Sequence, residues 1–156
     1  MRDAVDAGEK LRNALQELRI ELAIHTRRVA ALCGLNESDL DVLDLLAREG
    51  PQSPTMLARR LTIHVATMTG VLSRLEKADW VVRRRDVVDR RSVQVESTGF
   101  ERLDAIYRDV NERLDGIAAE LTARERELIV GYLRLVCDTI HQASVEMSRS
   151  RHAPSR

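Results

Sequence analysis

The sequence predicts a mostly α-helical protein with about six helices and a single β-hairpin. Apolar residues recur at helical spacing through most of the chain, and strict alternation of side chains replaces that spacing only around residues 80–96. Seven Gly and three Pro among 156 residues are too few for a turn-rich all-β protein. The length suits a single domain, and a hydrophobic content of 44% is sufficient for a buried core.

A long first helix is expected over residues 6–33. Its apolar residues follow one another in steps of four and three, which places them on one stripe: Leu11, Leu15, Leu18, Leu22, Val29 and Leu32. His25 interrupts this stripe. Gly34 suits the position just after the helix, where the backbone often turns left-handed.

Three shorter helices are expected between residues 37 and 78. Asn36 is a suitable N-cap for a helix over 37–48, which Gly50-Pro51 ends. Ser53-Pro54 has the form of a helix start, with a Ser cap and Pro in the first turn. A longer helix follows over 64–78. Its expected buried stripe is Met68, Val71 or Leu72, and Leu75.

Two short strands are expected over residues 80–85 and 92–96, where apolar and polar residues alternate. The segment DVVDRR that joins them contains no Gly, Asn or Pro, so a longer loop is expected in place of a tight two-residue turn. A short helix, a turn, a second helix and a β-hairpin together form a winged helix-turn-helix, expected here over residues 36–97.

Two long helices are expected over residues 98–148. Thr122 and Glu125 form a capping box at the start of the second. Apolar stripes run along both, in the first at Leu103, Ile106, Val110, Leu114, Ile117 and Leu121, and in the second at Ile129, Leu133, Val136, Ile140, Ala143 and Met147. These stripes and that of residues 6–35 are longer than the central module can cover. We therefore expect them to form a dimerisation region with a second copy of the chain. Residues 149–156 are expected to be a disordered tail.

The charge is distributed unevenly although the chain has 25 basic and 25 acidic residues. Residues 51–100 hold nine basic and five acidic residues, a net charge of +4. Five arginines fall within residues 83–92, on either side of the sequence DVVD. This concentration of positive charge indicates an anionic partner for the central segment.

Other classes of protein find little support in the sequence. No Ser-His-Asp arrangement, phosphate-binding loop, GxGxxG motif or metal-ligand cluster is present, so we expect no enzymatic activity, no metal and no cofactor. No apolar run approaches the ~18–20 residues of a membrane span, and no signal peptide is evident, which predicts a cytoplasmic protein without a membrane partner. Cys33 and Cys137 are expected to be thiols rather than a disulfide.

Two stretches resemble one known family. VATMTGVLSRLEKADWVVRR (residues 65–84) is similar to the recognition helix and first wing strand of the MarR family of bacterial transcription regulators. DVVDRRSVQV (residues 86–95) is similar to the wing of that family, with an Asp-x-Arg element before the second strand. One departure is Asp79, which stands where the family usually has Gly with left-handed backbone. The resemblance covers roughly residues 6–147.

The resemblance implies a homodimer that binds a near-palindromic DNA operator, with one recognition helix in the major groove of each half-site. It also implies a repressor that a small-molecule effector releases. The dimer interface is then expected to contain Leu11, Leu15, Leu18, Leu22, Ile129, Leu133, Val136 and Ile140.

The resemblance also indicates which residues meet DNA. Arg91 is expected at the wing tip and Arg90 on a backbone phosphate, braced by Asp89 and Asp86. Further expected contacts come from the two helices: Thr67, Thr69, His64, Ser53, Thr55 and Arg74. Alternatives stay open for two of them. Ser53 could act only as a helix cap, and Arg74 could brace the wing through Asp86 or Asp89.

His25 is either a ligand-pocket residue or a hydrogen-bonded interface histidine. Two other functions remain alternatives. One is a winged-helix module that binds protein and not DNA, which the zero net charge favours. The other is a regulator that senses oxidants through a cysteine.

Overall fold

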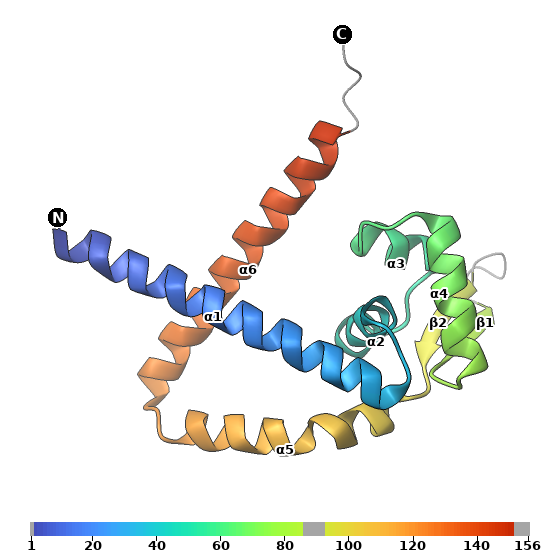
Figure 1. Ribbon diagram of the computed structural model, residues 1–156, viewed down its shortest axis with the longest axis horizontal. Helices are drawn as coiled ribbons and strands as arrows, with labels where there is room; N and C mark the ends of the chain where they lie inside the picture. Colours follow the sequence, from blue (N-terminus) through green and yellow to red (C-terminus); the bar gives the residue numbers. More distant parts are fainter. Residues whose placement is uncertain (1, 86–92, 152–156) are drawn as a thin grey trace, which may run out of the picture. The chain divides into compact units, whose positions relative to one another are not determined.

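In a computed structural model, the structure describes residues 2–85 and 93–151, and this part of the chain contains six helices and one two-stranded sheet (Figure 1). The elements follow in the order α1 (Arg2–Cys33), α2 (Glu37–Glu49), α3 (Pro54–Arg60), α4 (Val65–Lys77), β1 (Val81–Arg85), β2 (Val93–Ser97), α5 (Phe100–Ala119) and α6 (Ala123–Arg151). The predicted fold class, mostly α with a winged helix-turn-helix at its centre, is confirmed.

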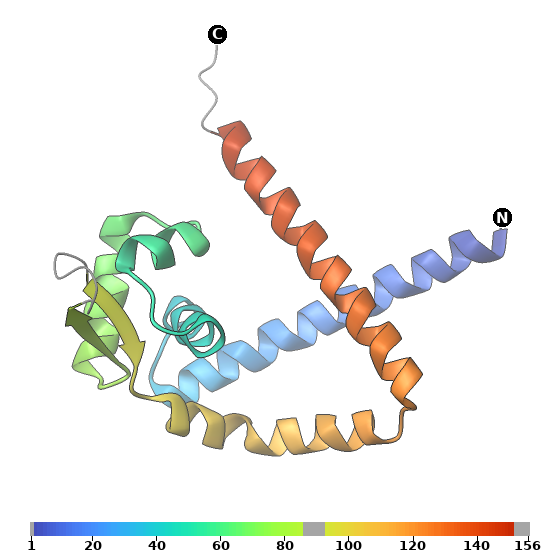
Figure 2. The same cartoon turned by 180° about the vertical axis from the view of Figure 1, so that it is seen from behind.

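The chain divides into two compact units, Met1–Leu103 and Asp104–Arg156. The division falls inside α5 and not at residue 97, where the sequence placed the end of the winged lobe. A single domain over residues 1–156 stays a prediction. Figure 2 shows from a second side how α2, α3, α4 and the hairpin gather in the first unit.

The core of the first unit lies among α2, α3, α4 and the hairpin. The predicted stripe of α4 is buried, with both Val71 and Leu72 inside. α2 buries Leu40 and Leu43, and β2 buries Val95. Side chains from several short elements meet in this way, so each element depends on the others for its stability.

Three helices of the first unit end in the same way, with a left-handed residue just past the helix. Gly34 (φ 67), Thr62 (φ 56) and Asp79 (φ 55) occupy this position after α1, α3 and α4. After each of them the next amide donates back into the helix, as Leu35 N does to Ala30 O at 2.8 Å and Trp80 N does to Leu75 O at 2.9 Å. This is the Schellman pattern, which satisfies carbonyls at a helix end. The prediction for Gly34 is confirmed, whereas Thr62 and Asp79 adopt a geometry that glycine favours.

The hairpin pairs β1 with β2 in antiparallel register, from Val81 opposite Ser97 to Arg85 opposite Val93. Gln52, just before α3, forms a bridge on the other edge of β2, and Val95 N donates to Gln52 O at 2.8 Å. The sequence prediction included Trp80 in the first strand, which is wrong. Trp80 lies in the turn just after α4, because its amide donates back to Leu75 O in the Schellman motif and not to the sheet.

The predicted caps at the starts of three helices are confirmed, whereas the helix predicted from residue 98 begins at Phe100. Asn36 and Asp39 form a capping box at α2, and Ser53 Oγ accepts from Met56 N at 3.3 Å at the start of α3. Thr122 and Glu125 form the reciprocal pair at α6, where Thr122 N donates to Glu125 Oε2 at 2.8 Å.

The long helices leave apolar side chains exposed. In the first unit the α1 stripe includes Leu11 and Leu18, each 48% exposed. In the second unit the α6 stripe includes Ile129 at 40% and Ile140 at 62%. The ends of these helices differ from prediction: α1 begins at Arg2, and α6 continues to Arg151, into the segment expected to be a tail. The added part of α6 contains Arg149 and Arg151, and arginine has a high helix propensity.

Candidate nucleic-acid interface

The N-terminal half of α4 presents a polar surface that no described element of the first unit covers. His64, the N-cap of α4, and the side chains of Thr67 and Thr69 are all exposed, whereas Met68 between the two threonines is fully buried. The buried stripe fixes the rotation of the helix about its axis, so the threonines necessarily point away from the core.

The two threonines differ in what their hydroxyl groups do. Thr69 Oγ1 donates to Val65 O at 3.0 Å, one helical turn earlier. Its oxygen and its methyl group remain available to a partner, but its proton is already used. Thr67 makes no hydrogen bond within the described residues, so its hydroxyl group can both donate and accept. Thr67 is therefore the more versatile of the two for contacts with a base edge.

The helix before the turn contributes Ser53 and Thr55. Ser53 is used as the N-cap of α3 through its bond from Met56 N. Thr55 lies exposed in the first turn of α3. Of this pair, Thr55 has its hydroxyl free of any capping bond in the described structure.

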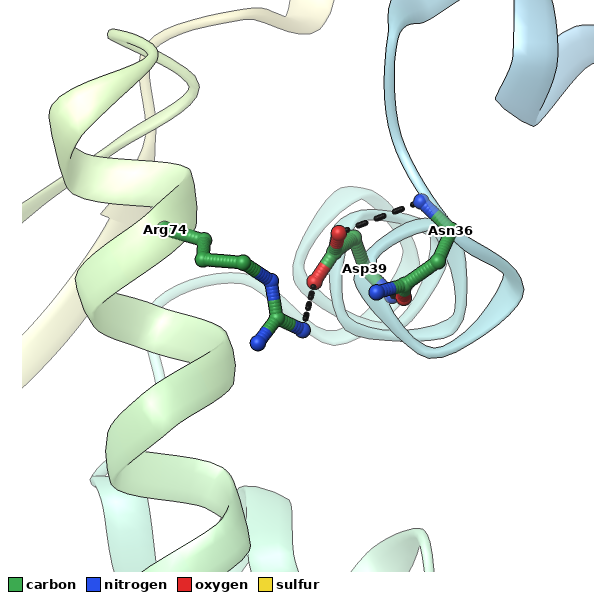
Figure 3. A network of polar contacts seen from close by, with 3 residues as sticks. All are labelled: Asn36, Asp39 and Arg74. Atoms are coloured by element: carbon green, nitrogen blue, oxygen red, sulfur yellow. Dashed lines mark hydrogen bonds and ion pairs between the residues drawn. The ribbon is translucent and has the colours of Figure 1, made fainter.

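Arg74 is held by a partner that the sequence did not predict. Its Nη2 donates to Asp39 Oδ1 at 2.8 Å, which joins α4 to the first turn of α2 (Figure 3). Asp39 is only 3% exposed, and its second oxygen accepts from Asn36 N at 3.1 Å. The capping pattern N-E-S-D in the sequence could have revealed the role of Asp39 in α2, but nothing local could have revealed Arg74 as its partner.

The three arginines of β1 are not equivalent. Arg84 pairs with Glu96 across the hairpin at 2.8 Å, and Arg83 lies 3.5 Å from Glu76 of α4. Arg85 is exposed and has no ion pair within the described part of the chain. Because alternate strand residues face opposite sides, Arg83 and Arg85 share one side of the hairpin and Arg84 lies on the other. Among the arginines of β1, Arg85 is therefore the one whose charge no described acidic residue neutralises.

The expected wing-tip contacts Arg90 and Arg91, and their expected braces Asp86 and Asp89, lie outside the described residues. The described hairpin ends at Arg85 and begins again at Val93.

His25 and Cys33 bear on two expectations from the sequence, an effector pocket and an oxidant-sensing cysteine. His25 is half-buried on α1. Burial raises the pKa of the Cys33 thiol above its ordinary value, although the nearby Arg102 opposes this shift. A raised pKa keeps the thiol protonated near neutral pH and slows its reaction with oxidants, which disfavours Cys33 as a redox sensor.

Within the described residues, no group of three or more His, Cys, Asp or Glu side chains is placed to hold a metal ion. No described helix is both long enough and apolar enough to cross a membrane.

Comparison with known proteins places this geometry in a family. Residues 35–93 match the model of the MarR family, and these residues contain α2, α3, α4 and β1. The transcriptional regulator FarR of Neisseria gonorrhoeae is 31% identical over 118 residues, which cover 74% of this chain and 80% of FarR. The chain belongs to the MarR family. It is accordingly a transcription regulator of the MarR type, and its relatives have a regulatory and not an enzymatic role.

Two further proteins extend the comparison. The transcriptional repressor YetL of Bacillus subtilis is 31% identical over 104 residues, which cover 64% of this chain and 62% of YetL. The crystal structure of NadR in complex with 4-hydroxyphenylacetate is 29% identical, with a TM-score of 0.60, and covers 81% of this chain and 91% of NadR. The similarity to known proteins thus extends well beyond residues 35–93.

Proposed function

We propose that this MarR-family chain is a homodimeric repressor that binds a near-palindromic operator in double-stranded DNA and that a small molecule releases. The observation that carries the proposal is the exposed polar face of α4 at Thr67 and Thr69, beside a hairpin whose Arg85 has no ion pair in the described residues. A recognition helix of this kind reads base edges in the major groove, while nearby arginines hold phosphates.

DNA contacts follow from this geometry. Thr67, Thr69 and His64 meet the major groove, and Thr55 lies at the start of the preceding helix, where phosphate binding is favourable. Ser53 supports this start as a cap. Arg74 acts mainly by holding α4 to α2 through Asp39. Arg85, Arg90 and Arg91 supply positive charge along the wing, with Asp86 and Asp89 as braces.

The exposed apolar stripes support a homodimer. Large side chains are exposed on α1 in the first unit and on α5 and α6 in the second, which is more than a monomer usually leaves uncovered. A second copy of the chain would bury them in a symmetric interface. Two recognition helices about 34 Å apart would then meet successive turns of the same face of DNA.

Two similar proteins support the proposals that the chain represses transcription and that a small molecule controls it. YetL is named a repressor, and NadR was crystallised with 4-hydroxyphenylacetate, a phenolic acid. For this chain we infer repression and release by a small phenolic or aromatic effector. The effector acts by binding more tightly to a dimer whose recognition helices are spaced wrongly for the operator. His25 on α1 is the described candidate for a polar contact with it.

A binding assay tests the proposal. The protein is first used to select duplexes from a random 30-base-pair library. Binding of a selected duplex is then measured by gel shift over a series of salt concentrations. We expect selection of an inverted repeat, and an affinity that falls steeply with salt as counterions are released. Thr67→Val should weaken the selected site more than random DNA. Absence of salt-dependent binding to any sequence would overturn the proposal and favour a protein-binding module.

A second measurement distinguishes a regulator that senses oxidants through a cysteine from one that a small molecule releases. Cys33→Ser and Cys137→Ser variants should bind the selected site as the unmodified protein does, before and after peroxide treatment. A loss of binding on oxidation that either substitution abolishes would favour the redox alternative.

A further inference from the structure

We propose that Arg102 is a positioning residue that locks the C-terminal end of the recognition helix α4 to the first turn of α5, and so sets how α4 meets DNA. This inference rests on the proposed function, because it concerns the placing of the helix that reads the operator. All of the contacts that carry it lie within the first unit.

The end of α4 is a strained point that needs support. Asp79 has φ 55, a left-handed conformation that aspartate tolerates less well than glycine. The turn also directs the carbonyls of Ala78 and Asp79 away from the helix, where the intrahelical ladder cannot satisfy them. Donors outside α4 can therefore stabilise this geometry by binding the two carbonyls.

Arg102 and Thr98 supply that support from the entry to α5. Arg102 Nη2 donates to Asp79 O at 2.9 Å and to Ala78 O at 3.3 Å. Thr98 Oγ1 donates to the same Asp79 oxygen at 3.0 Å. The cation lies at the negative end of the α4 dipole, which adds to the attraction. A left-handed aspartate is thus held by two donors on its carbonyl.

Trp80 completes the joint from the next position. The guanidinium carbon of Arg102 lies 3.9 Å from the centre of the Trp80 ring, within cation–π range. Trp80 is only 5% exposed, and its carbonyl accepts from Thr98 N at 2.9 Å and from Gly99 N at 3.2 Å.

Gly99 leaves room for the ring. A Cβ at Gly99 would lie 2.2 Å from Cε3 of Trp80, so any larger residue would push the ring out of place. The indole therefore packs directly on the backbone of the segment that leads into α5. Residues 78–80 and 98–102 form one interlocked unit, which we call the α4–α5 joint.

The contacts of Arg102 differ in kind from the ion pair that Arg113 forms elsewhere on α5. Arg113 pairs with Asp109 one turn earlier on the same helix, at 3.0 Å, and this pair joins α5 to no other element. Arg102 instead connects two elements, and its donors are directed at protein carbonyls. A change in the direction of the first turn of α5 is therefore transmitted to the end of α4 through these contacts. Arg102 therefore acts through α4 and not through a phosphate.

This role predicts a distinctive pattern of binding. Loss of a phosphate contact lowers the slope of log affinity against log salt by about 0.9 for each contact. Loss of a positioning residue should leave that slope unchanged and weaken only the selected site. We expect Arg102→Met to reduce affinity for the selected duplex about tenfold, a coupling typical of residues in one network, with random duplex bound as before.

The free protein supplies a second readout that needs no DNA. Trp80 is the single tryptophan of the chain, so emission and quenching by acrylamide report on the joint alone. Arg102→Met should expose the ring, increase quenching and speed hydrogen exchange at the Trp80 amide. Arg113→Met is the matched control and should change neither these signals nor DNA binding. Arg102→Lys keeps the charge without the planar fork and should give intermediate values.

Asp79→Gly tests the mechanism itself. Glycine adopts the left-handed conformation without strain, so the double variant Asp79→Gly/Arg102→Met should regain most of the selected-site affinity that Arg102→Met loses. Circular dichroism confirms that each variant is folded under the conditions of the binding assay. Glycine at position 79 also keeps the helix end intact if Arg102→Met alone fails to fold.

Each outcome decides the inference. A reduced salt slope in Arg102→Met with unchanged Trp80 quenching would identify a phosphate contact and overturn it. Unchanged quenching and unchanged affinity would overturn it as well, as would a double variant no better than Arg102→Met. If the unmodified protein binds no DNA, the proposed function fails, while quenching and exchange still decide whether Arg102 holds the end of α4.

Discussion

Arg74 of α4 and Asp39 of α2 form an ion pair, 2.8 Å between Nη2 and Oδ1, in which the carboxylate is buried and the arginine is half exposed. The same carboxylate caps α2 through Asn36 N. One side chain thus both starts α2 and holds the recognition helix to it. Because a buried charge is costly without partners, each of these bonds matters more than an exposed one.

Asp39→Ala should lower the free energy of unfolding by about 2–3 kcal/mol, since it removes the cap and the partner of Arg74 together. Arg74→Met should cost about 1–2 kcal/mol, because it leaves a buried carboxylate with its backbone bond alone. Urea denaturation followed by circular dichroism measures both. The control is Glu49→Gln, which breaks the more exposed pair of Glu49 with Arg60 and should cost less than about 1 kcal/mol. Equal losses in all three variants would contradict the role of burial.

Thr62→Gly should stabilise the protein by about 1 kcal/mol. Thr62 follows α3 with φ 56, a conformation that is especially unfavourable for a β-branched residue. Glycine relieves the strain, although part of the gain is offset by its greater freedom in the unfolded chain.

The melting temperature of Thr62→Gly is compared with that of Gly34→Ala, both measured by thermal unfolding. Gly34 has φ 67, and a methyl group added there would meet no other atom within 4 Å, so its replacement by Ala costs backbone strain alone. The two substitutions should therefore shift the melting temperature in opposite directions. A shift of the same sign would show that another contact of Thr62 outweighs the strain.

Patterns within a few residues made most of the fold predictable. Asn36, Ser53 and the Thr122–Glu125 pair start helices because their side chains satisfy nearby amides, and such bonds are visible at a spacing of three residues. The stripes of the long helices follow from period alone. The same reasoning placed Thr67 and Thr69 on the open face of α4, opposite Met68.

Contacts between distant residues were not predictable in this way. Arg74 and Asp39 are 35 positions apart, and Arg102 lies 23 from Asp79. The chain has 25 acidic residues, so the sequence offers each arginine many possible ion-pair partners. Which of them lies close enough is determined by how the helices pack. Trp80 was misassigned for a related reason. Apolar and polar residues alternate from Trp80 onward, as in a strand, whereas the left-handed backbone at Asp79 holds Trp80 in the turn after α4.

Glu96→Gln should strengthen the binding of random-sequence DNA. Glu96 pairs with Arg84 at 2.8 Å and neutralises it. Without that partner Arg84 is free to meet a phosphate, and the slope of log affinity against log salt should steepen by about 0.9. Fluorescence anisotropy of a labelled random duplex over a salt series measures the effect. Glu120→Gln makes the same change in net charge at an exposed position just after α5 and should leave the slope as it was. Equal gains in the two variants would attribute the effect to net charge and not to Arg84.

Leu133→Glu should convert the proposed homodimer to monomers. Leu133 lies in the α6 stripe and is 39% exposed in the single chain, with Ile129 and Ile140 on the same stripe. In the dimer its side chain would be covered by the second copy, where an unpaired carboxylate is strongly unfavourable. In the monomer the same carboxylate stays in water, so folding of the winged lobe should be retained.

Sedimentation velocity at micromolar concentration measures the oligomeric state, and the matched control is Gln142→Glu. Gln142 is exposed on α6 outside the predicted stripe, so the added charge should be tolerated. Dissociation by Leu133→Glu alone would also reduce operator affinity far more than random-DNA affinity, because a palindromic site needs two linked recognition helices. A Leu133→Glu protein that sediments like the unmodified chain would place the interface on another face, and the exposed Leu128 and Leu135 of the same helix would then be the next residues to change.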